Sequence, residues 1–338
     1  MLPFVNSETQ RRIAALMEVL GVYVAGGVVT NQLVRLLGIS FRNPLENLTV
    51  DITGRELITA SGHLFVLLLF QYAGYFFLII PINWWYRRRG PADYGLTRAG
   101  RSWAMLLRSG LGTAALSEWM VLGVGLVNAI HPSETVPWRQ AFFEMSWRRW
   151  EFWLFSSVMS WALIPVLEEL FFRGYCQRRL AEDWGDGPAI IATACLFTFA
   201  HAQYQIPNVY NAGMILGLLL SAIGFGVVFA WTRSLIPAML AHAVFDIPTT
   251  PRSQSLLVAA LVVGALFSWR QAVAIIGQVF RNGSGVTHSI LAVFSAGYAV
   301  AAARVRSLEY LAIGLLVFAV AFEALDRRQN GIPTARLP

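Results

Sequence analysis

Long apolar segments recur along the chain, separated by shorter polar stretches. A bilayer core about 30 Å thick is crossed by roughly 20 apolar residues in a helix. The pattern predicts spans near residues 13–38, 60–84, 103–130, 150–180, 189–207, 209–231, 235–247, 256–280, 286–303 and 307–325. We therefore expect an all-α fold, a polytopic transmembrane helical bundle with about 8–10 spans.

The composition points the same way. Hydrophobic residues make up 56% of the 338 positions and charged residues 13%, against about 25% charged in a soluble domain. The net charge of +7 comes from arginines that gather at the ends of the predicted spans, where positive charge sets topology. No basic stripe with interleaved aromatic residues stands out. We expect the lipid bilayer as a partner and no nucleic acid.

The arginines also predict which ends face the cytoplasm. Arg11 and Arg12 precede the first predicted span, and further arginines follow the second, fourth and sixth. Alternating crossings place all of these on the cytoplasmic side. The first apolar run lacks a clear cleavage site, so we expect a retained anchor. The prediction is an integral protein of a bacterial inner membrane with a cytoplasmic N-terminus.

Few ionisable residues lie deep inside the predicted spans, and five of them are Glu168, Glu169, His201, His242 and Asp246. Such groups are costly at membrane depth and tend to mark function. Counting a rise of about 1.5 Å per residue from the cytoplasmic ends places Glu168 roughly 15 Å deep, His201 roughly 18 Å and His242 roughly 10 Å. Three helices can therefore bring these side chains to a similar level.

Spacing within the helices adds detail. Residues four apart share a helix face, so Glu169 and Arg173 form a predicted pair. Glu168 is rotated by about 100° from Glu169 and can point elsewhere. Pro165 lacks an N–H and is expected to bend the helix one turn before Glu168, which can open room for water. The same spacing joins Phe197 with His201, and His242 with Asp246.

These residue types can activate water. A carboxylate beside a histidine can accept a proton from water, and a second histidine can donate to a developing oxyanion. Together they would hydrolyse an amide bond inside the membrane. Glu168, His201 and His242 could instead supply the three ligands of a catalytic zinc with one open position. The sequence leaves this alternative open.

A resemblance to a known family rests on three segments. They are Glu168-Glu169-Leu170-Phe171-Phe172-Arg173, Phe197-Thr198-Phe199-Ala200-His201 and His242-Ala243-Val244-Phe245-Asp246. They are similar, in the same order, to the EExxxR, FxxxH and HxxxN/D motifs of the CAAX protease and bacteriocin-processing (CPBP) intramembrane protease family. A single such motif arises by chance, but three in order on separate apolar segments form a specific pattern.

The resemblance implies a role for each matched residue. Glu168 would be the general base that activates water, assisted by His201. His242 and the residue at Asp246 would form the oxyanion site. Many family members have asparagine there, and an ionised aspartate would repel an oxyanion. Either Asp246 is protonated or it orients His242 instead, and we favour orientation. Supporting roles would fall to Glu169, Arg173 and Phe197.

The leading hypothesis is an intramembrane endopeptidase that cuts a membrane-associated peptide or protein in a cavity open to the cytoplasm. The motif-bearing core would cover residues 165–247, between N-terminal helices over 1–164 and additional C-terminal helices over 248–338. One alternative is a non-proteolytic scaffold or immunity factor that has kept the fold. Another is a proton-coupled transporter, because carboxylates and histidines also build proton relays. No paired internal repeat supports a transporter.

Overall fold

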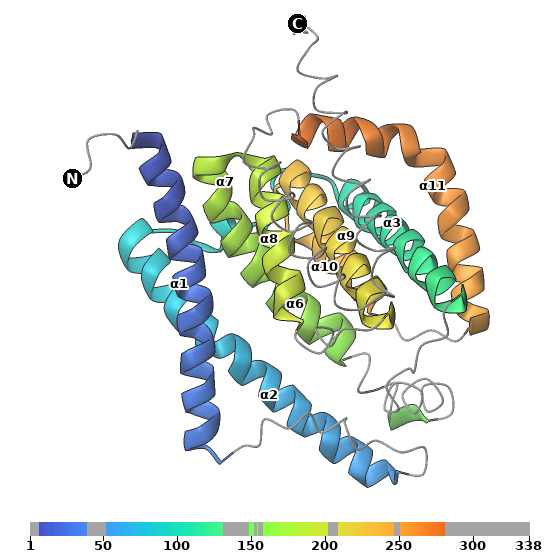
Figure 1. The fold of residues 1–338 in the computed structure, drawn as a ribbon, viewed down its shortest axis with the longest axis horizontal. Coiled ribbons are helices and arrows are strands. Elements are labelled where there is room, and N and C mark those ends of the chain that lie inside the picture. The colour runs from blue at the N-terminus through green and yellow to red at the C-terminus, as the bar shows by residue number, and fades with distance from the viewer. Residues whose placement is uncertain are drawn as a thin grey trace, which may run out of the picture.

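A computed structural model of the protein describes residues 7–38, 52–130, 149–151, 154, 158–201, 209–246 and 251–280. Within these ranges the regular structure is helical and no strand occurs, which confirms the predicted all-α bundle (Figure 1). The predicted spans at 286–303 and 307–325 lie outside the described residues, and so does most of the predicted loop at 247–251.

The long helices coincide with the predicted apolar segments. They are α1 (Ser7–Leu36), α2 (Gly54–Pro81), α3 (Trp103–Ile130), α8 (Asp186–Ala200), α9 (Val209–Thr232), α10 (Ile236–Phe245) and α11 (Pro251–Phe280). A π-helix, η1 (Ile82–Arg87), continues α2, and a 3-10 helix, η2 (Pro91–Tyr94), follows it. Pro251, predicted as the last loop residue, is the first residue of α11, where its missing N–H has no intrahelical partner to lose.

The later part of the predicted span at 150–180 is one continuous helical segment, called the rod below, which changes between π- and α-helix. It consists of η3 (Val158–Leu163), α6 (Ile164–Glu169), η4 (Leu170–Gln177) and α7 (Arg178–Trp184). Both η3 and η4 are π-helices, a rare form that is frequent at functional sites. Pro165, where the sequence predicts a bend, lies in the first turn of α6 directly after the π-helix η3, a position where proline is tolerated.

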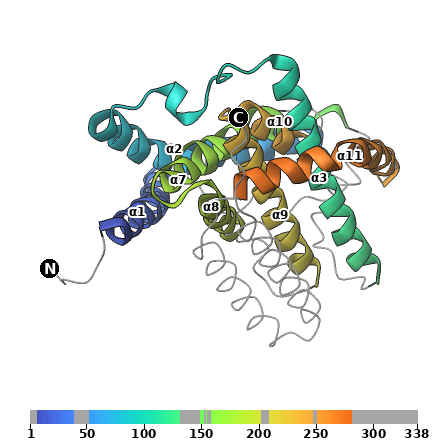
Figure 2. The ribbon, with the colours of Figure 1, turned by 90° about the horizontal axis from the view of Figure 1, so that it is seen from above.

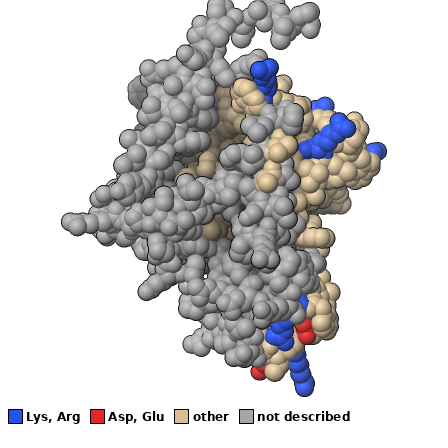
Figure 3. Space-filling view, turned by 90° about the vertical axis from the view of Figure 1, so that its right-hand side faces the viewer, with Lys and Arg blue, Asp and Glu red and all other residues tan. Residues whose placement is uncertain are grey.

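Three described segments are long and apolar enough to cross a membrane: Gln10–Leu36, Gly54–Arg87 and Met214–Thr232. The apolar helices α8 and α10 are shorter. On the described part of the face in Figure 3, charged side chains gather at the two ends with uncharged surface between them. The protein is an integral membrane protein, while its number of spans and its orientation stay predictions.

The central helices α6 to α10 lie between two outer pairs. Figures 1 and 2 place α1 and α2 at one end of the bundle, and α3 and α11 at the other. The first pair approaches closely because small residues meet there. A Cβ added to Gly74 of α2 would lie 2.6 Å from the Gly26 carbonyl oxygen of α1, and the Thr30 hydroxyl donates to the Gln71 carbonyl at 2.9 Å.

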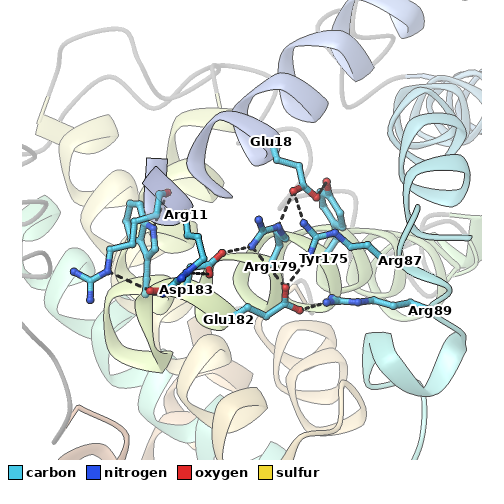
Figure 4. A network of polar contacts seen from close by, with 10 residues as sticks. Arg11, Glu18, Arg87, Arg89, Tyr175, Arg179, Glu182 and Asp183 are labelled. Carbon is cyan, nitrogen blue, oxygen red and sulfur yellow. Dashed lines mark hydrogen bonds and ion pairs between the residues drawn. The ribbon is translucent and has the colours of Figure 1, made fainter. Parts of the chain in front are cut away.

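An ion-pair network joins α1, the segment after α2, and α7 (Figure 4). Glu18 Oε2 accepts hydrogen bonds from Arg87 Nη2 at 2.8 Å and from Arg179 Nε at 2.7 Å. Arg179 also pairs with Asp183 at 2.7 Å, and Glu182 pairs with Arg87 at 3.0 Å. The sequence predicts that the arginines of these three segments share one side of the membrane, and in the structure they converge.

Candidate active site

Glu168 lies near the C-terminal end of α6 and is buried. Its Oε1 atom accepts a hydrogen bond of 2.8 Å from the Tyr72 hydroxyl of α2. Its Oε2 atom is also buried but accepts no hydrogen bond within the part of the chain that the structure describes. That oxygen lies 3.7 Å from His242 Nε2. One carboxylate oxygen is therefore anchored, and the other faces an imidazole.

Glu169 follows directly and has no solvent exposure. Its Oε1 atom lies 2.8 Å from Arg173 Nη1 and 2.8 Å from His242 Nδ1. The pair of Glu169 with Arg173 that the spacing predicts is present. The two adjacent glutamates thus meet the same imidazole at different nitrogens, Glu169 at Nδ1 and Glu168 at Nε2.

Arg173 is fully buried and holds three elements together. Its Nη2 atom donates to the Ala222 carbonyl of α9 at 3.0 Å. Its Cζ atom lies 4.7 Å from the ring centroid of Phe197 and 5.2 Å from that of Phe225. A guanidinium between two aromatic faces gains cation–π attraction, which is strongest where water is excluded.

His242 lies on α10 with an acidic oxygen facing each ring nitrogen. Besides the contact of Nδ1 with Glu169, its Nε2 atom lies 3.4 Å from Asp246 Oδ2, one turn along the same helix. The imidazole stacks on Phe225 with centroids 5.1 Å apart and an interplanar angle of 16°. Glu168, Glu169 and Asp246 surround this ring. An imidazole with protons on both nitrogens can donate toward both sides.

A short loop fixes the start of α10. The Gly95 carbonyl accepts a hydrogen bond of 2.8 Å from the Leu235 amide, directly before α10. Gly95 has φ +78°, and a Cβ there would lie 2.7 Å from the Phe229 ring. On the other side of the loop, a Cβ at Gly174 of η4 would lie 3.1 Å from the Tyr94 carbonyl. The loop therefore contacts the start of α10 and also η4, which continues directly from Glu169 at the end of α6.

His201 ends α8. Its backbone leaves the helix with φ −86° and ψ 64°, and its Nδ1 atom lies 2.8 Å from the Phe197 carbonyl. A carbonyl can only accept, so Nδ1 carries a proton and Nε2 is the acceptor nitrogen of the neutral ring. The Phe197 ring lies 4.6 Å from the imidazole of His201 and 5.9 Å from that of His242. Both histidines thus pack against the same phenyl ring.

The described residues do not form a metal site. No group of three His, Cys, Asp or Glu side chains among them has positions suited to holding a metal ion. The Glu168, His201 and His242 side chains are not gathered around a common point that could hold a metal ion, and we derive no step through one. The contact of His242 Nδ1 with Glu169 is not itself an argument against zinc, because a zinc-bound histidine commonly donates from its other ring nitrogen to a carboxylate.

Among the described residues, Tyr72, Phe225 and the carbonyl of Ala222 contact the site without belonging to the predicted set. None of them belongs to a motif. Tyr72 is 96 positions from Glu168, and an aromatic residue inside a long apolar segment carries no signal of a distant polar partner. The position of Ala222 among small residues of α9 fits close packing, but it does not indicate an acceptor for Arg173.

Comparison with known proteins adds one finding. Residues 150–248 match a family model described as Rce1-like, Type II CAAX prenyl endopeptidase Rce1-like. No curated protein and no solved structure matches the chain. The matched segment contains the acidic doublet, both histidines and Asp246. The resemblance stated from the three motifs is confirmed by this match of residues 150–248 to the Rce1-like type II CAAX prenyl endopeptidase model.

Proposed function

We propose that the protein is an intramembrane endopeptidase that hydrolyses a peptide bond of a membrane-associated substrate with water activated by Glu168. The observation that carries this proposal is the Oε2 atom of Glu168. It is buried, accepts no hydrogen bond among the described residues and lies 3.7 Å from His242 Nε2. A buried polar atom that finds no hydrogen bond among the described residues calls for an explanation, and a role in activating water supplies one.

The chemical step needs a base and an oxyanion donor on the same reacting group. Glu168 Oε2 accepts a proton from water, and the water oxygen forms a bond to the carbonyl carbon of the substrate. The carbonyl oxygen becomes an oxyanion, to which His242 donates from Nε2. When the carbonyl re-forms, the C–N bond breaks and Glu168 passes its proton to the leaving nitrogen.

Neighbouring groups support this step. Glu169 fixes the ring of His242 through Nδ1, and Arg173 neutralises Glu169 in a buried pair. Asp246 lies 3.4 Å from His242 Nε2, a position suited to orienting the imidazole rather than to binding an oxyanion directly. His201 assists Glu168 by accepting a hydrogen bond from the attacking water at Nε2. Phe197 packs between the two histidines and Arg173.

The substrate class follows from the setting of the site. The carboxylates lie in a bundle with long apolar helices, so a substrate must reach them from the bilayer or its surface. The matched family is described as a type II CAAX prenyl endopeptidase. We propose that the scissile bond lies close to a lipid-anchored or membrane-spanning segment of the substrate, and that the active site opens to the cytoplasm.

The test uses the full-length protein reconstituted in liposomes with two fluorogenic probes. One probe is a farnesylated peptide with a C-terminal CAAX sequence, and the other is an unmodified single-span peptide. The variant Glu168→Gln keeps the size of the side chain but removes the base. Glu56→Gln is the matched control, because Glu56 lies in a helix-capping box far from the site along α2, where glutamine also functions.

We expect the wild type and Glu56→Gln to cleave at least one probe, and Glu168→Gln to lose about a hundredfold or more in rate. Full activity in Glu168→Gln would contradict the proposed base. Absence of cleavage of both probes by folded wild-type protein would contradict the protease assignment for these substrate classes and favour a scaffold.

A further inference from the structure

We propose that Tyr72 is a positioning residue for Glu168, and that α2 thereby completes an active site that the motif-bearing segment does not contain by itself. The proposal rests on the proposed function of Glu168 as the base. The Tyr72 hydroxyl donates to Glu168 Oε1 at 2.8 Å, and both side chains are buried. Tyr72 lies outside the matched segment at residues 150–248.

The hydrogen bond determines which oxygen can act. The last torsion of a glutamate side chain is broad and nearly two-fold, so its two oxygens exchange easily unless one is held. With the phenol on Oε1, the plane of the carboxylate is fixed and Oε2 is directed toward His242 Nε2 at 3.7 Å. Without the phenol, Glu168 would spend time with its plane turned away from the imidazole.

Aromatic packing holds the phenol in place. The Tyr72 ring lies 5.8 Å from that of Tyr75 and 6.4 Å from that of Phe76 on the same helix. Tyr75 in turn stacks on Phe171 with centroids 4.3 Å apart. Phe171 follows Glu168 by three positions on the same rod. Tyr72 is therefore joined to the rod twice, directly at Glu168 and through Tyr75 at Phe171.

The first helix contributes to this arrangement. Tyr23 of α1 stacks on Tyr75 with centroids 5.8 Å apart and an interplanar angle of 20°. A Cβ at Gly26 of α1 would collide with the Tyr75 ring, so α1 covers the aromatic cluster closely. The two N-terminal helices thus act as a support that presents one hydroxyl to the base.

The opposing explanation is that the hydrogen bond only satisfies a buried polar pair. In that case its loss would lower stability and leave the catalytic rate of the folded protein unchanged. A positioning role predicts that the catalytic rate of the folded protein falls when the hydrogen bond is lost. Because the substrate does not need to touch Tyr72, the loss should fall on kcat and not on KM.

The test compares Tyr72→Phe with Tyr75→Phe in the liposome assay, using whichever probe the wild type cleaves. Each change removes one hydroxyl from a buried ring of the same cluster, and only that of Tyr72 bonds Glu168 among the described contacts. We expect Tyr72→Phe to lower kcat by about tenfold or more, the effect of losing a hydrogen bond to a charged group, with KM changed by less than about twofold. Tyr75→Phe should stay close to wild type.

A measurement without turnover complements the rates. Difference infrared spectra of wild type and Glu168→Gln identify the carboxylate band of Glu168. We expect Tyr72→Phe to shift this band and Tyr75→Phe to leave it in place. An unshifted band, or a kcat for Tyr72→Phe equal to that of Tyr75→Phe, would overturn the positioning role. If Glu168→Gln is itself fully active, the proposed function fails first, so the two failures are distinguishable.

Discussion

Glu169 and His242 are 73 positions apart in the chain and are joined by a contact of 2.8 Å between Glu169 Oε1 and His242 Nδ1. The same oxygen lies 2.8 Å from Arg173 Nη1. The second glutamate of the doublet thus connects the rod that carries the proposed base to the helix that carries the proposed oxyanion donor. An ion pair with Arg173 alone would need only one glutamate. Here Glu169 makes that pair and also contacts His242, so Glu168 is left for the proposed catalytic role.

The buried ion pair of Glu169 with Arg173 predicts a large loss of thermal stability in Glu169→Ala. The change leaves Arg173 buried without its ion-pair partner, and removal of one partner from a buried pair costs roughly 3–5 kcal/mol. Thermal unfolding in detergent should show a clearly lower midpoint. Glu182→Ala is the control, because Glu182 is 30% exposed and its partly exposed pairs should contribute no more than about 1 kcal/mol each. Equal midpoints for the two variants would contradict the central role of Glu169.

His201→Ala should lose activity without losing its fold. Its ring contacts Phe197 and bonds the Phe197 carbonyl in the last turn of α8, while the His201 backbone amide bonds the Thr198 carbonyl independently of the side chain. If His201 assists Glu168 in activating water, cleavage should slow by about 10²–10⁴-fold with little change in the unfolding midpoint. His63→Ala, at an exposed position of α2, should cleave at the wild-type rate. A wild-type rate in His201→Ala would remove this residue from the mechanism.

Substitutions of Asp246 test whether this residue orients the His242 ring or acts through its negative charge. We expect Asp246→Asn to keep activity within about tenfold of wild type, because asparagine keeps the shape of the side chain and a polar oxygen beside His242 Nε2. Asp246→Ala removes that oxygen and should be slower than Asp246→Asn. Steady-state rates of both variants in the same liposomes decide the matter. The reverse order, with alanine the faster, would show that Asp246 does not act by orienting His242.

Packing between the first two helices predicts unequal effects of the same substitution. In Gly74→Ala the new methyl group would meet the Gly26 carbonyl and the Thr30 hydroxyl, and overpacking of this kind costs about 1–3 kcal/mol. Gly62→Ala, on the same helix, adds a methyl group where nothing lies within 4 Å. Thermal midpoints should fall for the first variant and stay unchanged or rise for the second. A similar fall in both would show that α1 and α2 are not closely packed.

The helices and the local pairs could be predicted from the sequence because both depend on short-range patterns. The segment 103–130 was expected to be helical from its apolar residues, and α3 has the same limits. Glu169 with Arg173 follows from a spacing of four on one face. The motif residues of the candidate site were all identified in this way, although their catalytic roles remain predictions.

Contacts over long separations could not be predicted. Tyr72 resembles every other aromatic residue in an apolar helix, and its bond to Glu168 depends on how α2 packs against the rod. The π-helical turns of η4 were also missed, because an apolar segment does not reveal whether its carbonyls pair four or five residues ahead. The order of Glu168, His201 and His242 along the chain likewise could not show whether their side chains gather around one metal ion. Among the described residues they do not.

The central claim is that Glu168 and His242 act on one reacting group, and a double-mutant comparison tests it most directly. Single-turnover cleavage should be measured for Glu168→Gln, His242→Ala and the variant that carries both changes. Residues that work as a unit give losses that do not add in free energy, so we predict that the double variant is about as slow as the slower single variant. Rate losses that multiply, or a wild-type rate in Glu168→Gln, would contradict the account.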